Sequence, residues 1–183
     1  MIKSLQEILQ KETGAVTMKT LYVIRHAKSS WNFLHLPDYE RPLNNRGNRD
    51  APLMGQRFRA RGIVPDCLVC SPALRARETA IKISIEIGFP ENSIIYKRSI
   101  FEAGVPALLR TVEAFPEKAF SAFLVGHNPG MTSLAEYLTG KQISSLPTCG
   151  VACIDMDIDS WSLAGRGLGN LDFLDYPKKN FSV

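Results

Sequence analysis

Short apolar runs of strand-like composition alternate along this chain with longer segments whose apolar residues recur at helical spacing. Strands are expected at 20–26, 66–71, 93–96, 122–127 and 149–157, with an edge strand over 160–163. Helices are expected at 44–61, 73–88, 105–115 and 130–139, where glycine or proline marks each end. This alternation predicts an α/β fold, a three-layer sandwich with a mostly parallel central sheet and helices on both faces.

The two ends of the chain stand outside this alternation. Residues 1–18 are expected to form an N-terminal extension, in which four aliphatic residues share one face of a short helix. This extension is either a docking helix or the result of a misassigned translation start, in which case Met18 would be the first residue. The main domain is expected over 19–164, and the tail 165–183 is expected to pack on it or to fray. Pro52, inside the first predicted helix, indicates a kink or a later helix start.

Composition adds that the chain is an ordinary globular protein. With 183 residues, 45% hydrophobic and 22% charged, it is long enough for one domain with a real core. Because no secretory pattern and no run of eighteen apolar residues occurs, we expect a cytoplasmic protein without a membrane partner. The formal net charge of +4 is compatible with an anionic substrate.

Six arginines crowd the stretch between positions 41 and 61. They are Arg41, Arg46, Arg49, Arg57, Arg59 and Arg61. We interpret them as a solvated helix face with a few functional members, so no nucleic-acid partner is expected. Strongly salt-dependent binding to nucleic acid would instead support a nucleic-acid-binding role for these arginines.

Four cysteines invite a disulfide or zinc interpretation. Cys67 and Cys70 lie three apart in a predicted strand, so their thiols point to opposite faces and cannot bind one metal ion. Only three histidines are present, and they form no complementary ligand cluster. We therefore expect no metal and no cofactor, and interpret all four, including Cys149 and Cys153, as buried free thiols in a reducing compartment.

Chemically competent residues gather where predicted strands end. Arg25 and His26 end the first strand, and His127 ends the fourth after Gly126, which permits close backbone approach. Arg75 lies in the first turn of the helix that follows the second strand, where a helix N-terminus and a guanidinium group suit a dianion. Since the carboxyl ends of parallel strands meet at one sheet edge, these residues predict a phosphate site.

The motifs LYVIRHAKSSWN, SPALRARETA and LVGHNPG, in this order, resemble those of the histidine phosphatase superfamily. The segments RHAKSSW, ERPLNNRG and VGHNPG are more closely similar to the small SixA-type phosphohistidine phosphatases. The resemblance covers roughly residues 19 to 160 and implies a phosphoglycerate mutase-like fold. Ala27 stands where the superfamily motif has glycine, a form familiar in the SixA-like branch.

The resemblance also implies roles for individual residues. His26 would be the nucleophile, with Arg25, Arg75 and His127 forming the rest of the phosphate pocket. Glu102 lies where relatives have their general acid. Two further phosphate contacts are implied for Ser29 and Asn32, whereas His35 either lines the pocket entrance or merely lies in the polar loop.

These residues predict a metal-independent phosphatase that works through a covalent phosphohistidine intermediate. About fifty residues separate His26 from Arg75, and about as many separate Arg75 from His127, which leaves little chain for a lid. An open pocket favours phosphohistidine presented by a protein as the substrate. Small phosphorylated metabolites remain the alternative, and a non-catalytic phosphate-binding module is a second alternative. The oligomeric state stays open.

Overall fold

The computed structural model describes residues 18–31 and 36–179. The expected helix within residues 1–17 lies outside the described residues, as do Asn32 and His35. In the part of the chain that the structure describes, no helix combines the length and the apolar character needed to cross a membrane.

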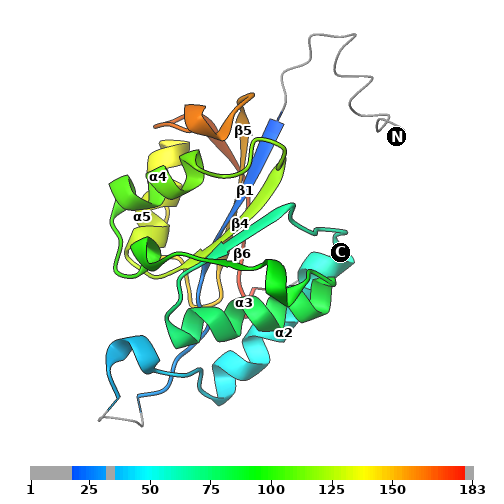
Figure 1. Ribbon diagram of the computed structural model, residues 1–183, viewed down its shortest axis with the longest axis vertical. Helices are drawn as coiled ribbons and strands as arrows, with labels where there is room; N and C mark the ends of the chain where they lie inside the picture. The colour runs from blue at the N-terminus through cyan, green and yellow to red at the C-terminus, as the bar shows by residue number, and fades with distance from the viewer. Residues whose placement is uncertain (1–17, 32–35, 180–183) are drawn as a thin grey trace.

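One six-stranded sheet forms the centre of the fold (Figure 1). Its strands are β1 (Met18–Arg25), β2 (Cys67–Cys70), β3 (Ile95–Tyr96), β4 (Ser121–Gly126), β5 (Val151–Asp157) and β6 (Gly169–Asp175). They are arranged in the order β3-β2-β4-β1-β5-β6. The pairs among β3, β2, β4 and β1 are parallel, and β5 is antiparallel to both β1 and β6. Only β5 therefore runs against the others, and the prediction of a mostly parallel sheet is confirmed.

Helices cover both faces of this sheet, as Figure 1 shows. On one face lie α2 (Asn45–Ala60) and α3 (Leu74–Ile87), and on the other α4 (Val105–Glu113) and α5 (Gly130–Thr139). Four short 3-10 helices join these elements: η1 (Asp38–Glu40), η2 (Glu91–Ser93), η3 (Arg98–Ile100) and η4 (Trp161–Leu163). The predicted three-layer sandwich is thus confirmed.

Strand β1 shows how the sequence builds both cores. Leu21 and Val23 pack in the core beneath α4 and α5, whereas Tyr22 and Ile24 pack in the core beneath α2 and α3. Successive side chains of a strand point to opposite faces, so an unbroken apolar run is what a strand covered on both sides requires. The buried centre of the sheet holds the ends of β1 and β4 in fixed register.

The cysteines of β2 follow the same rule. Cys67 belongs to the core under α4 and α5, and Cys70 to the core under α2 and α3. The prediction that their thiols diverge is confirmed, and all four cysteines are buried and free.

The expected edge strand over Ser160–Leu163 is wrong, because this segment forms η4. The indole N–H of Trp161 donates to the carbonyl of Ala119 at 2.8 Å, and the ring is fully buried against Phe115. Burying this large side chain turns the chain inward. The edge strand is β6 instead, formed by residues that the sequence analysis assigned to the tail.

Helix α2 begins where the sequence placed its cap. The side chain of Asn44 accepts the backbone N–H of Gly47 at 3.0 Å, which satisfies a donor of the first turn. Pro52 lies inside this helix, so the expectation that it marks a later start is wrong.

The arginines of α2 are only in part a solvated face. Arg49 and Arg59 are exposed, as expected, but Arg57 is buried and forms an ion pair with Asp175 of β6 at 2.7 Å. Its guanidinium group also donates to the backbone carbonyls of Tyr176, Pro177 and Lys179. A single side chain of α2 therefore fixes the segment that follows β6.

Candidate active site

The sheet brings the two strand-ending histidines together. Arg25 pairs with Gly126 at the carboxyl ends of β1 and β4, and the backbone N–H of His26 donates to the Gly126 carbonyl at 2.9 Å. As a result, the ring centroids of His26 and His127 lie 5.0 Å apart with their planes inclined by 55°. Register between parallel strands thus creates a pair of imidazoles that lie 101 residues apart in sequence.

The hydrogen bonds of His26 define its tautomer. Nδ1 lies 2.7 Å from the carbonyl oxygen of Ala27, and a carbonyl only accepts, so Nδ1 holds the proton. Nε2 is therefore unprotonated, and its lone pair accepts the Nε–H of Arg75 at 3.2 Å. A nucleophilic imidazole requires such an unprotonated nitrogen, and the Arg75 hydrogen bond must break before it attacks.

Arg75 lies in the first turn of α3 and is almost fully buried. Besides donating to His26, its terminal nitrogens donate to Asp38, one to the backbone carbonyl and one to the carboxylate at 2.7 Å. The position of α3 is set by Thr79, whose hydroxyl accepts the Ala27 N–H at 2.9 Å and donates to the Arg75 carbonyl. The loop after β1 and the first turns of α3 consequently form one hydrogen-bonded unit.

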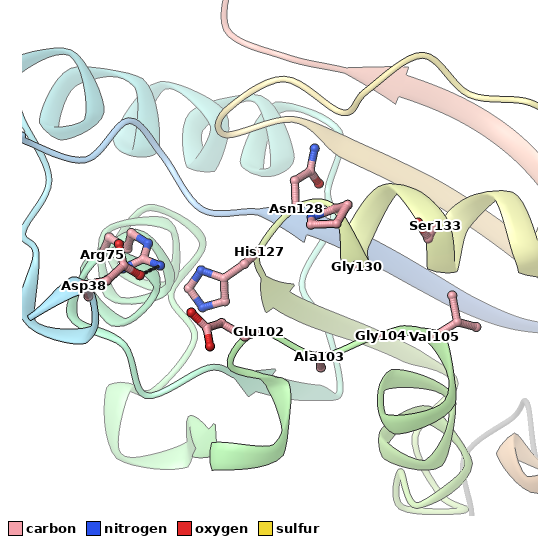
Figure 2. A pocket seen from close by; sticks show the side chains of 11 residues that line it. Asp38, Arg75, Glu102, Ala103, Gly104, Val105, His127, Asn128, Gly130 and Ser133 are labelled. Atoms are coloured by element: carbon pink, nitrogen blue, oxygen red, sulfur yellow. Dashed lines mark hydrogen bonds and ion pairs between the residues drawn. The ribbon is translucent and has the colours of Figure 1, made fainter.

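Asp38 is a site residue that the sequence analysis missed. Its carboxylate contacts Arg41 at 2.6 Å as well as Arg75, and Figure 2 shows it facing the Arg75 guanidinium group. Burial alone would raise the pKa of Asp38, but hydrogen bonds and positive charge from Arg41 and Arg75 outweigh it and lower the pKa. The group is therefore a carboxylate at neutral pH, and it occupies one terminal nitrogen of Arg75 that suits a phosphate oxygen.

His127 is the second buried imidazole. Its Nε2 lies 2.8 Å from the hydroxyl of Ser71 at the end of β2, and the ring of Phe101 packs edge-on against it. Its Nδ1 is buried and has no hydrogen-bond partner among the described residues. Since a buried donor or acceptor without a partner costs free energy, this nitrogen is suited to a ligand.

Both imidazoles are held neutral by their surroundings. Burial lowers the pKa of His26 to about 4; Arg75 and Arg25 add to this effect, and the Ala27 carbonyl opposes it. Burial likewise lowers the pKa of His127 to about 3, helped by His26 and Arg75. At pH 7 the positive charge of the site therefore resides on arginine, and both imidazoles are neutral.

A cavity of about 510 Å³ opens beside these groups (Figure 2). Asp38, Arg75, Glu102 and His127 line it, together with residues 103–105, 128–130 and 133. The Glu102 carboxylate points toward the His127 ring. Glu102 has a φ of 54°, a left-handed conformation that costs a non-glycine residue about 1 kcal/mol and is typical of functional positions.

The family model of the histidine phosphatase superfamily (branch 1) matches residues 21–104. A protein of Mycobacterium leprae is 30% identical over 145 residues, which cover 73% of this chain and 87% of that protein. The chain belongs to the histidine phosphatase superfamily.

Solved structures place it in the SixA-type branch. A SixA protein from Agrobacterium tumefaciens is 26% identical with a TM-score of 0.73, and the match covers 87% of this chain and 99% of that one. The protein histidine phosphatase SixA complexed with tungstate has a TM-score of 0.75 at 20% identity, over 86% of this chain and 97% of that one. Membership of this superfamily supports phosphatase activity.

The remaining predicted residues of this histidine phosphatase lie beside the cavity rather than in it. The Ser29 hydroxyl accepts a hydrogen bond from Arg41 at 3.1 Å, and Gly126 packs where an added Cβ would lie 2.6 Å from the Cε of Met131. Neither lines the cavity. Arg25 donates to the Leu146 carbonyl at 2.7 Å, and its Nε is buried without a hydrogen-bond partner among the described residues.

Among the described residues, no group of three or more His, Cys, Asp and Glu side chains is placed to hold a metal ion. Of the four residues predicted to bind phosphate, Arg75 and His127 line the cavity, whereas Arg25 and His26 do not.

The lowered pKa values of His26 and His127 predict that the folded protein loses stability in acid and that both histidines stay neutral well below pH 6.5. Because the unfolded imidazoles titrate near 6.5 and the folded ones near 4 and 3, the unfolded state binds protons first as pH falls. The free energy of unfolding should therefore decrease from about pH 6.5 down to about pH 3. NMR of the ring nitrogens should show His26 and His127 neutral at pH 5. In His26→Gln the acid-dependent loss should be smaller, and a His26 that titrates near 6.5 would contradict this account.

Asp38→Asn should strengthen the binding of inorganic phosphate. The change weakens the contact with one terminal nitrogen of Arg75 and removes a negative charge next to the dianion. An exposed ion pair is worth up to about 1 kcal/mol, so about fivefold tighter binding is expected. Calorimetry at fixed ionic strength measures it. The control is Glu40→Gln, which removes the same charge from the same 3-10 helix. Weaker binding by Asp38→Asn would mean that Asp38 orients Arg75 instead of competing with phosphate.

Proposed function

We propose that this histidine phosphatase transfers a phosphoryl group from its substrate to Nε2 of His26 and then to water, and that phosphohistidine in proteins is the substrate. The observation that supports this most directly is the state of His26. Its ring is neutral, its proton is on Nδ1, and its Nε2 lies beside a buried arginine. A surface or structural histidine needs none of these features.

Binding begins with an exchange of anions at Arg75. The phosphoryl group replaces the Asp38 carboxylate on the guanidinium group, and Arg25 supplies a second positive charge. The neutral ring of His127 donates one N–H to a phosphoryl oxygen. Such preorganised donors offset the repulsion between a dianion and an approaching nucleophile, and they stabilise charge on the equatorial oxygens in the transition state.

The lone pair of Nε2 then attacks phosphorus in line as the bond to the leaving group breaks. The electron pair of that bond departs with the leaving atom, which takes up a proton. His26 gains positive charge, and its Nδ1–H bond to the Ala27 carbonyl holds the ring in place and favours that charge. In the second step water attacks phosphorus, the N–P bond breaks, and phosphate and neutral His26 are restored.

Glu102 fits the role of proton donor in this scheme. It lies in the same cavity as His127 and Arg75, and its strained backbone directs the carboxyl group toward them. An alkoxide leaving group depends strongly on such a donor. A protonated imidazole leaves without one, because its pKa is near 6.5.

The form of the pocket favours a side chain presented by another protein. The cavity is bordered by η1, by the loops that follow η3 and β4, and by the first turn of α5. None of these described segments closes over it as a separate domain would. The relative described as a protein histidine phosphatase supports the same substrate. Small phosphate esters are the second candidate, favoured by the placement of Glu102.

Covalent catalysis predicts a labelled His26. Rapid alkaline quenching of the enzyme with a labelled phosphate donor should trap an acid-labile phosphate, and peptide mapping should place it on His26. His26→Ala should lower kcat by roughly a thousandfold or more, since a nucleophile has no substitute. Circular dichroism serves as the folding control. Unchanged turnover, or a label on another residue, would remove the assignment.

Substrate preference is tested by comparing a phosphohistidine peptide with a panel of phosphate esters. The peptide should have the highest kcat/KM. Glu102→Gln should lower kcat for esters about a hundredfold, as loss of a general acid does, but for the peptide less than about tenfold. Glu91→Gln, an exposed glutamate in η2, is the matched control. An ester preferred by two orders of magnitude in kcat/KM would overturn the proposed substrate.

A further inference from the structure

A second cavity, of about 370 Å³, lies next to the first. It is formed by the loop after β1, the first turn of α2, the loop before β5 and the segment after β6. The carbonyl of Leu146 accepts hydrogen bonds from Asn128, which lines the first cavity, and from Arg25, which lines the second. One carbonyl therefore connects a lining residue of each cavity, and Arg25 directly precedes His26 in the sequence.

Positive charge dominates this second cavity. Four cations line it, Arg25, Lys28, Arg46 and Lys178, against the single carboxylate of Asp50. Asp50 is buried and already contacts Arg46 at 3.6 Å and Arg49 at 3.1 Å. Among the described residues, Lys28 and Lys178 form no ion pair. A concave surface with excess charge of one sign attracts a ligand of the other sign.

Hydrogen-bond donors are also available there. The Nε of Arg25 is buried and has no hydrogen-bond partner in the part of the chain that the structure describes, whereas the Nε of Arg46 faces the Asp50 carboxylate at 3.6 Å. The hydroxyl of Thr148 accepts from Arg46 at 2.9 Å, which leaves its own proton free to donate. Guanidinium N–H groups and a hydroxyl are typical ligands of phosphate and carboxylate.

The wall that presents Lys178 is firmly held. The carbonyls on both sides of it, those of Pro177 and Lys179, accept hydrogen bonds from the buried guanidinium group of Arg57. Little ordering of the backbone is then required when an anion binds, and preorganisation of this kind favours affinity.

We propose that this anion cleft, lined by Arg25, Lys28, Arg46, Thr148 and Lys178, binds a second anionic group of the substrate, a phosphate or a carboxylate. The inference rests on the proposed function, because it places the reacting phosphoryl group at His26. A phosphorylated small molecule with a further anionic group supplies this chemistry. An acidic side chain next to a phosphorylated residue supplies it equally, and the proposed function favours this second source.

Two pairs of substrates test the proposal and distinguish the sources. Phenyl phosphate is compared with 3-carboxyphenyl phosphate, and a phosphohistidine peptide with glutamine neighbours is compared with one that has glutamate neighbours. The double variant Arg46→Gln, Lys178→Gln should raise KM about tenfold or more for the substrates with a second anion, as expected for lost hydrogen bonds to charged groups. For the other member of each pair, kcat and KM should change less than threefold. A selective effect on the esters alone identifies the small molecule, and one on the peptides alone identifies the protein.

Lys118→Gln, at an exposed lysine in the loop before β4, removes one positive charge and is the charge-matched control for each single variant, Arg46→Gln and Lys178→Gln, which should show the same selectivity as the double variant. An equal loss for both members of each pair, or no loss for either, would overturn the proposal.

The proposed function could be wrong while the anion cleft is real, and a binding experiment distinguishes the two. If the wild-type protein turns over none of these substrates, calorimetry with benzylphosphonate and 3-carboxybenzylphosphonate, which are not hydrolysed, still tests the cleft. The carboxylated compound should bind about tenfold more tightly to the wild-type protein and to Lys118→Gln, but not to the double variant. Equal binding of the two compounds to the wild-type protein would exclude the cleft as a second anion site.

Discussion

The hydrogen bond from Nδ1 of His26 to the carbonyl of Ala27 is the interaction on which the site depends. It places the proton on the ring nitrogen that faces the backbone and leaves Nε2 directed at Arg75. Its geometry is inherited from the sheet, because the N–H of His26 is bound by β4 and its carbonyl accepts the N–H of Cys149. The reactivity of Nε2 therefore depends on the register between β1 and β4.

The fold was largely predictable because its information is local. Unbroken apolar runs and capped helical segments specify a sheet covered on both faces, and the motifs at the strand ends specify which edge holds the site. The error at Ser160–Leu163 has a tertiary cause, since only the buried position of Trp161 explains the 3-10 helix there. Strand β6 was missed because its residues alternate imperfectly and β5 is its single partner in the sheet.

The site was predictable as far as residue type signals chemistry. Arg25, His26 and His127 stand out because each ends a strand. Asp38 does not, because its significance lies in contact with Arg75, 37 residues away, and nothing around it in the sequence indicates that partner. The lowered pKa values of the two histidines have the same origin. Burial is their main cause, and burial is a property of the assembled molecule.

Arg57 has a consequence for the order in which the two cavities form. The catalytic groups come from β1, β4 and α3, all tied to the central strands of the sheet. The neighbouring cleft also needs the segment after β6, the outermost strand, which is held by one guanidinium group of α2. Strand β6 has a neighbouring strand on one side only, and local opening begins at such edges. A molecule whose last strand has peeled away would thus retain its nucleophile but lose one wall of the neighbouring cleft, so chemistry and selectivity would fail at different stages of unfolding.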